Sequence, residues 1–163
     1  MTPGELWPAT GALCWRLVTD AVMGGVSRGS IAEMAIAGRD AVQMCGRVST
    51  ENNGGFIQIA LDLAPDGGAI DASGLTGIVL DVFGTGERYG AHLRSTDLDR
   101  PQQSYRQEFV APSQWTTIEL PFAQFAPHRT DAPLNIARLR RIGLVAMGRE
   151  FDGDLAVARL AFY

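Results

Sequence analysis

Asp20-Ala-Val-Met-Gly-Gly-Val-Ser27 and Glu51-Asn-Asn-Gly-Gly-Phe56 are the two stretches that decide the fold of this chain. Each stretch interrupts a run of alternating apolar and polar residues, and each contains two adjacent glycines. Adjacent glycines let the backbone adopt positive φ or pass close to another segment. In the second stretch, Asn53-Gly54 predicts a hairpin turn, because a type I′ turn needs positive φ at both central residues. We therefore expect tight turns between strands at both places.

Alternation with a period of two residues dominates the remaining sequence, whereas helical periodicity is scarce. The pattern predicts strands at 14–19, 41–49, 56–63, 77–83, 89–95, 105–110, 115–122, 142–147 and 155–163. Turn-forming residues separate these runs, which indicates an all-β sandwich or jelly roll built as one domain over residues 1–163. Two short helices are expected, at 30–37, where Ser30 and Glu33 form a capping box, and at 134–141.

The composition is that of an acidic globular protein. The chain has 163 residues and a net charge of −4, and all fourteen of its basic residues are arginine. A negative net charge argues against nucleic acid as a partner. No stretch approaches the roughly 20 apolar residues of a spanning helix, so we expect no membrane insertion. Residues 1–8 lack the basic and apolar regions of a secretory signal, which predicts a cytoplasmic protein.

Two cysteines, Cys14 and Cys45, lie in apolar runs. They would pair only if the first strand lay beside the strand that holds Cys45, and the alternative is that both are reduced, buried residues. Two cysteines and two distant histidines do not make a zinc site, and no clear ligand cluster for calcium is present. We therefore expect no metal and no cofactor.

Gly25-Val-Ser-Arg-Gly29 matches the G-x-S-x-G pattern of the α/β-hydrolase nucleophile elbow, and Ser27, Asp97 and His128 follow the hydrolase order along the chain. That elbow needs a strand, a sharp turn and a helix, built after several βα units. Only a short segment precedes Ser27, and the chain lacks the required helices. We therefore interpret Ser27 as a turn or strand-entry residue and expect no enzyme.

Gly84-Thr-Gly-Glu-Arg-Tyr-Gly90 imitates a dinucleotide-binding glycine loop after an apolar strand. Its third glycine is out of register, and the following residues continue as a strand. Pyrophosphate binding needs the N-terminus of a helix at that place. A hairpin turn explains the glycines better.

Five polar residues occupy the outward positions of three expected strands: Gln58, His92, Arg94, Arg106 and Glu108. If these strands are neighbours in one sheet, the five side chains form one polar patch. The patch is either an ordinary solvated face with weak cross-strand ion pairs, or a groove that binds a sugar or an amide.

Four segments of the chain resemble the complex I intermediate-associated protein 30 family. They are Trp15 to Ser27, Gly46 to Phe56, Gly84 to Tyr89 and Gly153 to Val157, supported by Trp115 ahead of Leu120-Pro-Phe. The resemblance implies a jelly-roll sandwich of the galactose-binding-like type. It also implies an assembly factor that binds partly built respiratory complex I without catalysing a reaction, and a free-standing bacterial-type member. No catalytic residues carry over from the family signature.

Three functions follow as hypotheses. The first is a protein-binding domain whose partners are respiratory complex I subunits or intermediates, with an exposed patch near Met23. The second is a saccharide or small-ligand module that uses the polar patch, and the third is a hydrolase, which needs His92 or His128 within reach of Ser27. Alternatively, Asp20, Ser27 and the glycines only fix two tight turns. The candidate binding residues are Asp20, Met23, Ser27, Asn53, Gln58, His92, Arg94, Arg106 and Glu108.

Overall fold

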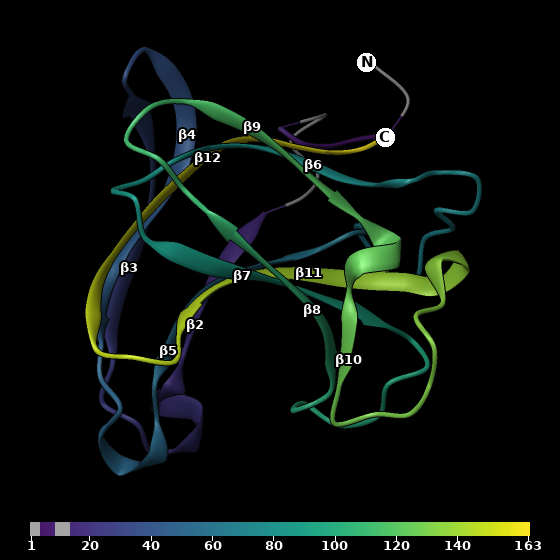
Figure 1. Cartoon of the computed structure of the whole chain (residues 1–163), viewed down its shortest axis with the longest axis horizontal. Helices are drawn as coiled ribbons and strands as arrows, with labels where there is room; N and C mark the ends of the chain where they lie inside the picture. Colours follow the sequence, from purple (N-terminus) through teal and green to yellow (C-terminus); the bar gives the residue numbers. More distant parts are fainter. Residues whose placement is uncertain (1–3, 9–13) are drawn as a thin grey trace.

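The computed structural model describes residues 4–8 and 14–163, and these form two antiparallel β-sheets packed face to face (Figure 1). The first sheet has the order β3-β4-β12-β6-β9, with β1 also paired to β12. Its strands are β1 (Glu5–Trp7), β3 (Arg28–Ile36), β4 (Arg39–Val48), β6 (Gly77–Phe83), β9 (Thr116–Pro121) and β12 (Phe151–Phe162).

The second sheet has the order β10-β8-β7-β11-β5-β2. Its strands are β2 (Trp15–Thr19), β5 (Phe56–Asp62), β7 (Arg88–Ser95), β8 (Ser104–Val110), β10 (Ala126–His128) and β11 (Leu139–Met147). Four single-turn 3₁₀-helices join the strands: η1 (Asp20–Met23), η2 (Glu51–Asn53), η3 (Phe122–Gln124) and η4 (Ile136–Arg138). The predicted all-β sandwich is therefore confirmed.

The core lies between the two sheets and follows from the alternation in the sequence. Ile57, Ile59 and Leu61 of β5 point inward and are fully buried in it. Burial of an aliphatic side chain of this size contributes about 1.5–3 kcal/mol, so each inward position stabilises the sandwich. Both faces of β6 are covered, as its apolar run predicts, and its buried Asp81 is neutralised by Arg39 at 2.9 Å.

The helix predicted at 30–37 is wrong, because this segment is the strand β3. Ser30 pairs with Cys45 of β4 instead of capping a helix. The two strands are joined by Ala37 and Gly38, which both have positive φ (46° and 84°), as in a type I′ hairpin. Cross-strand pairing along β4 therefore outweighs the helical pattern of 30–37. At 134–141 the helix is limited to the single turn η4, and β11 begins directly after it.

Two of the predicted turns also differ from the structure. Asn53-Gly54 does not form a type I′ hairpin, because Gly54 has φ −77°, and the positive φ values fall on Asn52 and Gly55. Gly84 does not begin a hairpin either: the segment after it carries the chain from β6 in the first sheet to β7 in the second. There the amide of Gly84 donates to the carbonyl of Pro112 at 2.7 Å.

The two cysteines are not paired in the structure. Cys14 and Cys45 are both free thiols. Cys14 is exposed and Cys45 is half-buried, so the expectation that both are buried is wrong. Burial and the neighbouring Asp154 raise the pKa of the Cys45 thiol, which keeps it protonated at neutral pH.

Candidate functional site

The carboxylate of Asp20 holds the two glycine-containing stretches together. Asp20 is fully buried at the start of η1. Its Oδ1 accepts a hydrogen bond from the Ser27 amide at 3.0 Å, and its Oδ2 accepts from Ser27 Oγ at 2.5 Å. The same Oδ2 accepts from the amides of Gly55 at 2.6 Å and Phe56 at 3.3 Å. One side chain therefore satisfies donors from both stretches, and we call this arrangement the Asp20 network.

Two glycines are required because the Asp20 carboxylate occupies the space where a side chain would lie. A Cβ at Gly25 would lie 2.8 Å from Asp20 Cβ, and a Cβ at Gly54 would lie 2.5 Å from Asp20 Oδ2. Real Cβ contacts are never this short. At these two positions glycine is required because the backbone packs directly against a buried carboxylate.

The Asp20 network fixes an exposed apolar surface. Val22 and Met23 lie in η1 and Val26 follows it, and their exposed fractions are 75%, 57% and 43%. Asn52 Nδ2 donates to the carbonyl of Gly24 at 3.3 Å, which ties the second stretch to this surface. The two stretches lie together at the lower end of the sandwich in Figure 1, below β2 and β5. We call Val22, Met23 and Val26 the apolar tip.

Ser27 is placed for structure and not for nucleophilic attack. Its hydroxyl donates to Asp20, and Ser27 Oγ accepts from the Ser49 amide at 2.8 Å. In residues 4–8 and 14–163 no hydrogen bond joins Ser27 to a histidine. The chain continues from Ser27 into the strand β3, so the strand-to-helix elbow of a hydrolase is absent here. Asn53 ends η2, and its side chain lies outside the described part of the structure.

The second sheet brings most of the predicted polar patch together. β8, β7, β11 and β5 are successive neighbours, and Arg106 lies opposite His92. Glu108 lies opposite Gly90, whose other neighbour Val145 is paired with Gln58. The patch therefore extends across four strands on the outer face of the sheet.

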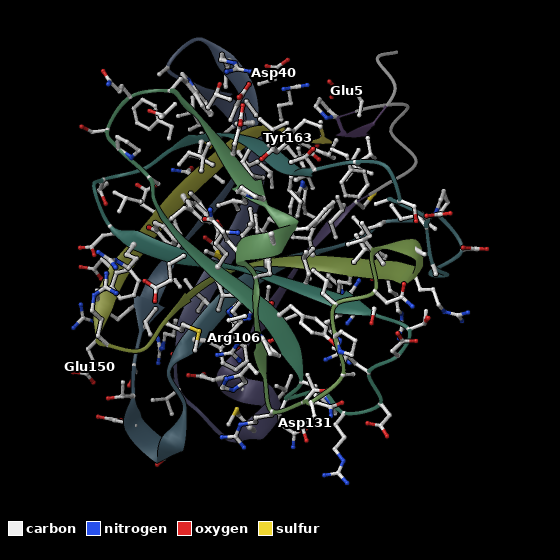
Figure 2. All side chains as sticks on the ribbon, turned by 45° about the vertical axis from the view of Figure 1, so that its right-hand side comes forward. Glu5, Asp40, Arg106, Asp131, Glu150 and Tyr163 are labelled. Atoms are coloured by element: carbon white, nitrogen blue, oxygen red, sulfur yellow. The ribbon has the colours of Figure 1, made fainter. Side chains whose placement is uncertain are left out.

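A pocket of about 250 Å³ lies within this face. Its lining includes Gly90 and His92 of β7, Arg106 and Glu108 of β8, and Met147 of β11. The imidazole of His92 lies close to Gly90, where a Cβ would come within 3.0 Å of His92 Nε2. Figure 2 labels Arg106 in the lower half of the molecule, with Asp131 below it.

Two of the predicted residues, Arg94 and Glu108, already have partners in the structure, and of these two Glu108 lines the pocket. Arg94 donates to the carbonyls of Arg100 at 3.0 Å, Pro101 and Gln103, so it holds the loop between β7 and β8. Glu108 forms an ion pair with Arg88 at 3.1 Å, and both side chains are exposed. Arg88 on β7 and Glu108 on β8 thus form a cross-strand ion pair of the kind expected for a solvated face. Gln58 also lies outside the pocket lining.

His92 and Arg106 are two ionisable residues of the pocket whose pKa values are shifted by their surroundings. Burial, together with the positive charges of Arg106 and His128, lowers the pKa of His92 to about 3, so His92 is neutral at physiological pH. Burial also lowers the pKa of Arg106, as does the nearby Arg129. Arg106 Nε donates to Ser104 Oγ at 2.9 Å. Within the described chain no ion pair connects Arg106 with a carboxylate.

Sequence reasoning missed several residues of these two surfaces. Val22 and Val26 were not singled out, although they share the Met23 turn. His128 was considered only as a hydrolase histidine, and Arg129 not at all. Their proximity to Arg106 depends on the pairing of β10 with β8, in which Ala126 lies opposite Arg106. No local sequence pattern indicates that pairing.

Among residues 4–8 and 14–163, no three His, Cys, Asp or Glu side chains gather as ligands for a metal ion. No helix in the same residues has the length and apolar character needed to cross a membrane.

Two stacked antiparallel sheets, one with a polar outer face, define a jelly-roll β-sandwich. Solved structures of carbohydrate-binding modules share this fold. A family 11 module of the cellulosomal cellulase Lic26A-Cel5E of Clostridium thermocellum has a TM-score of 0.72 and 14% identity, covering 97% of this chain and 91% of its own. A family 11 module from the same organism, solved with a β-1,3-1,4-mixed-linked tetrasaccharide, has a TM-score of 0.71 and 15% identity, covering 99% and 96%.

A family 30 module of the cellulosomal cellulase Cel9D-Cel44B of Clostridium thermocellum has a TM-score of 0.60 and 9% identity, covering 85% of this chain and 91% of its own. At these identities the likeness concerns the fold alone, and it is consistent with a galactose-binding-like sandwich. The model of the complex I intermediate-associated protein 30 (CIA30) family matches residues 6–158. The chain therefore belongs to the CIA30 family. No curated protein matches it.

Proposed function

We propose that this chain is a non-catalytic binding domain that assists the assembly of respiratory complex I and contacts its protein partner through the apolar tip. The observation that carries this proposal is the exposure of Val22 and Met23 on a turn fixed by a fully buried carboxylate. Membership of the CIA30 family supports complex I subunits or intermediates as the partner.

The physical case for the apolar tip rests on preorganisation. Burying a valine or methionine side chain against a partner contributes about 1.5–3 kcal/mol each. Ordering a flexible loop during binding would offset part of that gain. Here the Asp20 network already fixes the turn before any partner binds, because it connects η1 to Gly55 and Phe56. The tip therefore offers apolar contact area at a small entropic cost.

The tip is tested by replacing Val22 and Met23 together with serine. We expect recovery of complex I subunits in a pull-down from the native cell extract to fall at least about tenfold, because two apolar contacts are lost. Stability should change by less than about 0.5 kcal/mol, since both residues are exposed. Met34→Ser is the matched control, because Met34 on β3 is 48% exposed but lies outside the tip. Equal recovery with the double variant would contradict the proposal.

A second candidate function is the binding of a saccharide on the outer face of the second sheet. The pocket of about 250 Å³ beside Arg106 and His92 favours it, and solved structures with the same fold are carbohydrate-binding modules. A bound saccharide would raise the melting temperature of the chain through mass action. The pocket is connected to the Asp20 network, because the amide of Gly148, a lining residue, donates to the carbonyl of Gly55 at 3.3 Å.

A further inference from the structure

Four nitrogen-bearing side chains gather at one edge of the polar face without a carboxylate among them. They are His92 of β7, Arg106 of β8, His128 of β10 and Arg129 directly after β10, and we call them the cationic cluster. His92 lies opposite Arg106, and His128 lies opposite Ser104. Arg129 Nε donates to His128 Nε2 at 3.3 Å. Three strands therefore bring two imidazoles and two guanidinium groups together.

Arg106 and Arg129 supply the positive charge of the cluster, because the pKa values of both imidazoles are lowered. Burial and then the charges of Arg106 and Arg129 lower the pKa of His128, and Arg106 and His128 act on His92 in the same direction. The other two arginines of the pocket lining do have acidic partners, because Arg88 is paired with Glu108 and Arg149 with Glu87. Arg106 is the pocket arginine that has none within the described chain. An unpaired, half-buried guanidinium is costly, and an anion beside it would offset that cost.

The positive pocket contrasts with the chain as a whole. The net charge of the protein is −4, whereas the pocket lining contains three arginines and one carboxylate, that of Glu108. A neutral polymer gains nothing from this local charge, whereas an anion is attracted to it. The contrast therefore favours an anionic ligand over a neutral one.

The lining of the pocket also argues against a neutral sugar held by ring stacking. The aromatic ring in the lining belongs to Tyr89, which is 1% exposed, and its hydroxyl accepts from the amide of Asp154 at 2.9 Å. The pocket therefore presents guanidinium and imidazole groups to a sugar ring, together with the half-buried apolar side chain of Met147. The planar guanidinium of Arg106 matches a carboxylate through two parallel hydrogen bonds.

We propose that the pocket binds an acidic saccharide, and that the terminal nitrogens of Arg106 hold the carboxylate of a uronic acid residue. This proposal rests on the second candidate function. His92 lies beside Arg106 in register and offers an imidazole N–H or a lone pair to the sugar hydroxyls. The volume of about 250 Å³ is smaller than a typical drug-sized site and suits a single sugar ring. Met147 on β11, across β7 from the strand of Arg106, supplies an apolar contact for the ring carbons.

Calorimetric titration with matched pairs of oligosaccharides tests the proposal. The probes are trimers of galacturonate, glucuronate and mannuronate, each paired with the neutral trimer of galactose, glucose or mannose. We expect one acidic trimer to bind and its neutral counterpart to bind at least about tenfold more weakly, because the charged hydrogen bonds are lost. Arg106→Gln should weaken the acidic trimer by a similar factor. Arg28→Gln removes the same charge from exposed Arg28 on β3 and should leave binding unchanged.

The outcomes separate the two proposals. Equal binding of a neutral and an acidic trimer, unaffected by Arg106→Gln, would leave saccharide binding standing and overturn the acidic specificity. Failure of every trimer to bind would overturn saccharide binding itself. Binding of a triglutamate peptide as tightly as the acidic trimer, with the same loss in Arg106→Gln, would show a carboxylate site that does not recognise sugars, and would also overturn the proposal.

Discussion

Replacing Asp20 with alanine is expected to lower the free energy of unfolding by about 4 kcal/mol, measured by urea denaturation. The substitution leaves the amides of Ser27, Gly55 and Phe56 without their acceptor inside the protein. Each unsatisfied buried donor costs about 1–3 kcal/mol, and the void left by the carboxylate adds to the loss. Asp71→Ala is the control, because Asp71 is exposed and accepts a hydrogen bond from the amide of Ser73 within its own turn. A loss below about 1 kcal/mol would contradict the Asp20 network.

Asp20→Asn separates the charge of the side chain from its shape. Oδ1 and Oδ2 both accept from N–H groups, so either orientation of an asparagine amide places a donor against a donor. We expect a loss of about 2 kcal/mol at neutral pH. Burial raises the pKa of Asp20, but the hydrogen bonds from Ser27, Gly55 and Phe56 outweigh it and hold the pKa below its ordinary value of 3.8.

The lowered pKa of Asp20 also fixes the direction of a pH effect. The unfolded chain takes up a proton on this carboxyl at a higher pH than the folded chain does. The stabilisation is therefore complete above about pH 4 and is lost as the pH falls through the folded-state value. The difference in unfolding free energy between the wild type and Asp20→Asn should narrow below about pH 4. A difference in unfolding free energy that widens below about pH 4 would contradict the lowered pKa of Asp20.

Gly54→Ala is expected to cost about 3 kcal/mol of stability, from steric overlap alone. Its φ of −77° suits any residue, but the new Cβ would lie 2.5 Å from Asp20 Oδ2 and 2.9 Å from Gly25 Cα. Insertion of an extra carbon into a closely packed site typically costs about 1–3 kcal/mol or more. Gly153→Ala is the matched control, because its Cβ would meet Ala146 and Ile57 at an ordinary 3.5 Å. Unfolding in urea measures both variants.

A double-mutant cycle shows whether Asp20 causes the cost. In a chain that already carries Asp20→Ala, the clash with the carboxylate is removed. Gly54→Ala should then cost clearly less than in the wild type, with a coupling of about 1–2 kcal/mol. Strict additivity of the two substitutions would mean that the overlap lies elsewhere and that the glycine does not serve the Asp20 network.

The strands could be predicted from the sequence because period-two alternation directly reflects one buried and one exposed face. The run at 77–83 coincides with β6, and the others differ from their strands mainly at the ends. β3 was missed because Glu33, Met34 and Ala35 favour a helix locally, whereas pairing with β4 decides their conformation. The Ala37-Gly38 turn was missed as well, since alanine seldom adopts positive φ.

The candidate sites depend on contacts that no local pattern contains. Both stretches with paired glycines were recognised, but the reason for the glycines is the carboxylate of Asp20, which lies 35 residues from Gly55. The polar patch followed from alternation along β7 and β8. The net charge of the patch could not be predicted from the sequence. It depends on Arg94, which is bound by the loop carbonyls, and on Arg129, which follows β10 in the chain.

Oxidative footprinting of the methionines in the bound state tests the role of the apolar tip most directly. Met23 and Met34 are 57% and 48% exposed, so the free chain should oxidise at both. With complex I subunits bound, the account predicts that Met23 becomes protected while Met34 is oxidised as before. Oxidation of Met23 at an unchanged rate in the complex would contradict it.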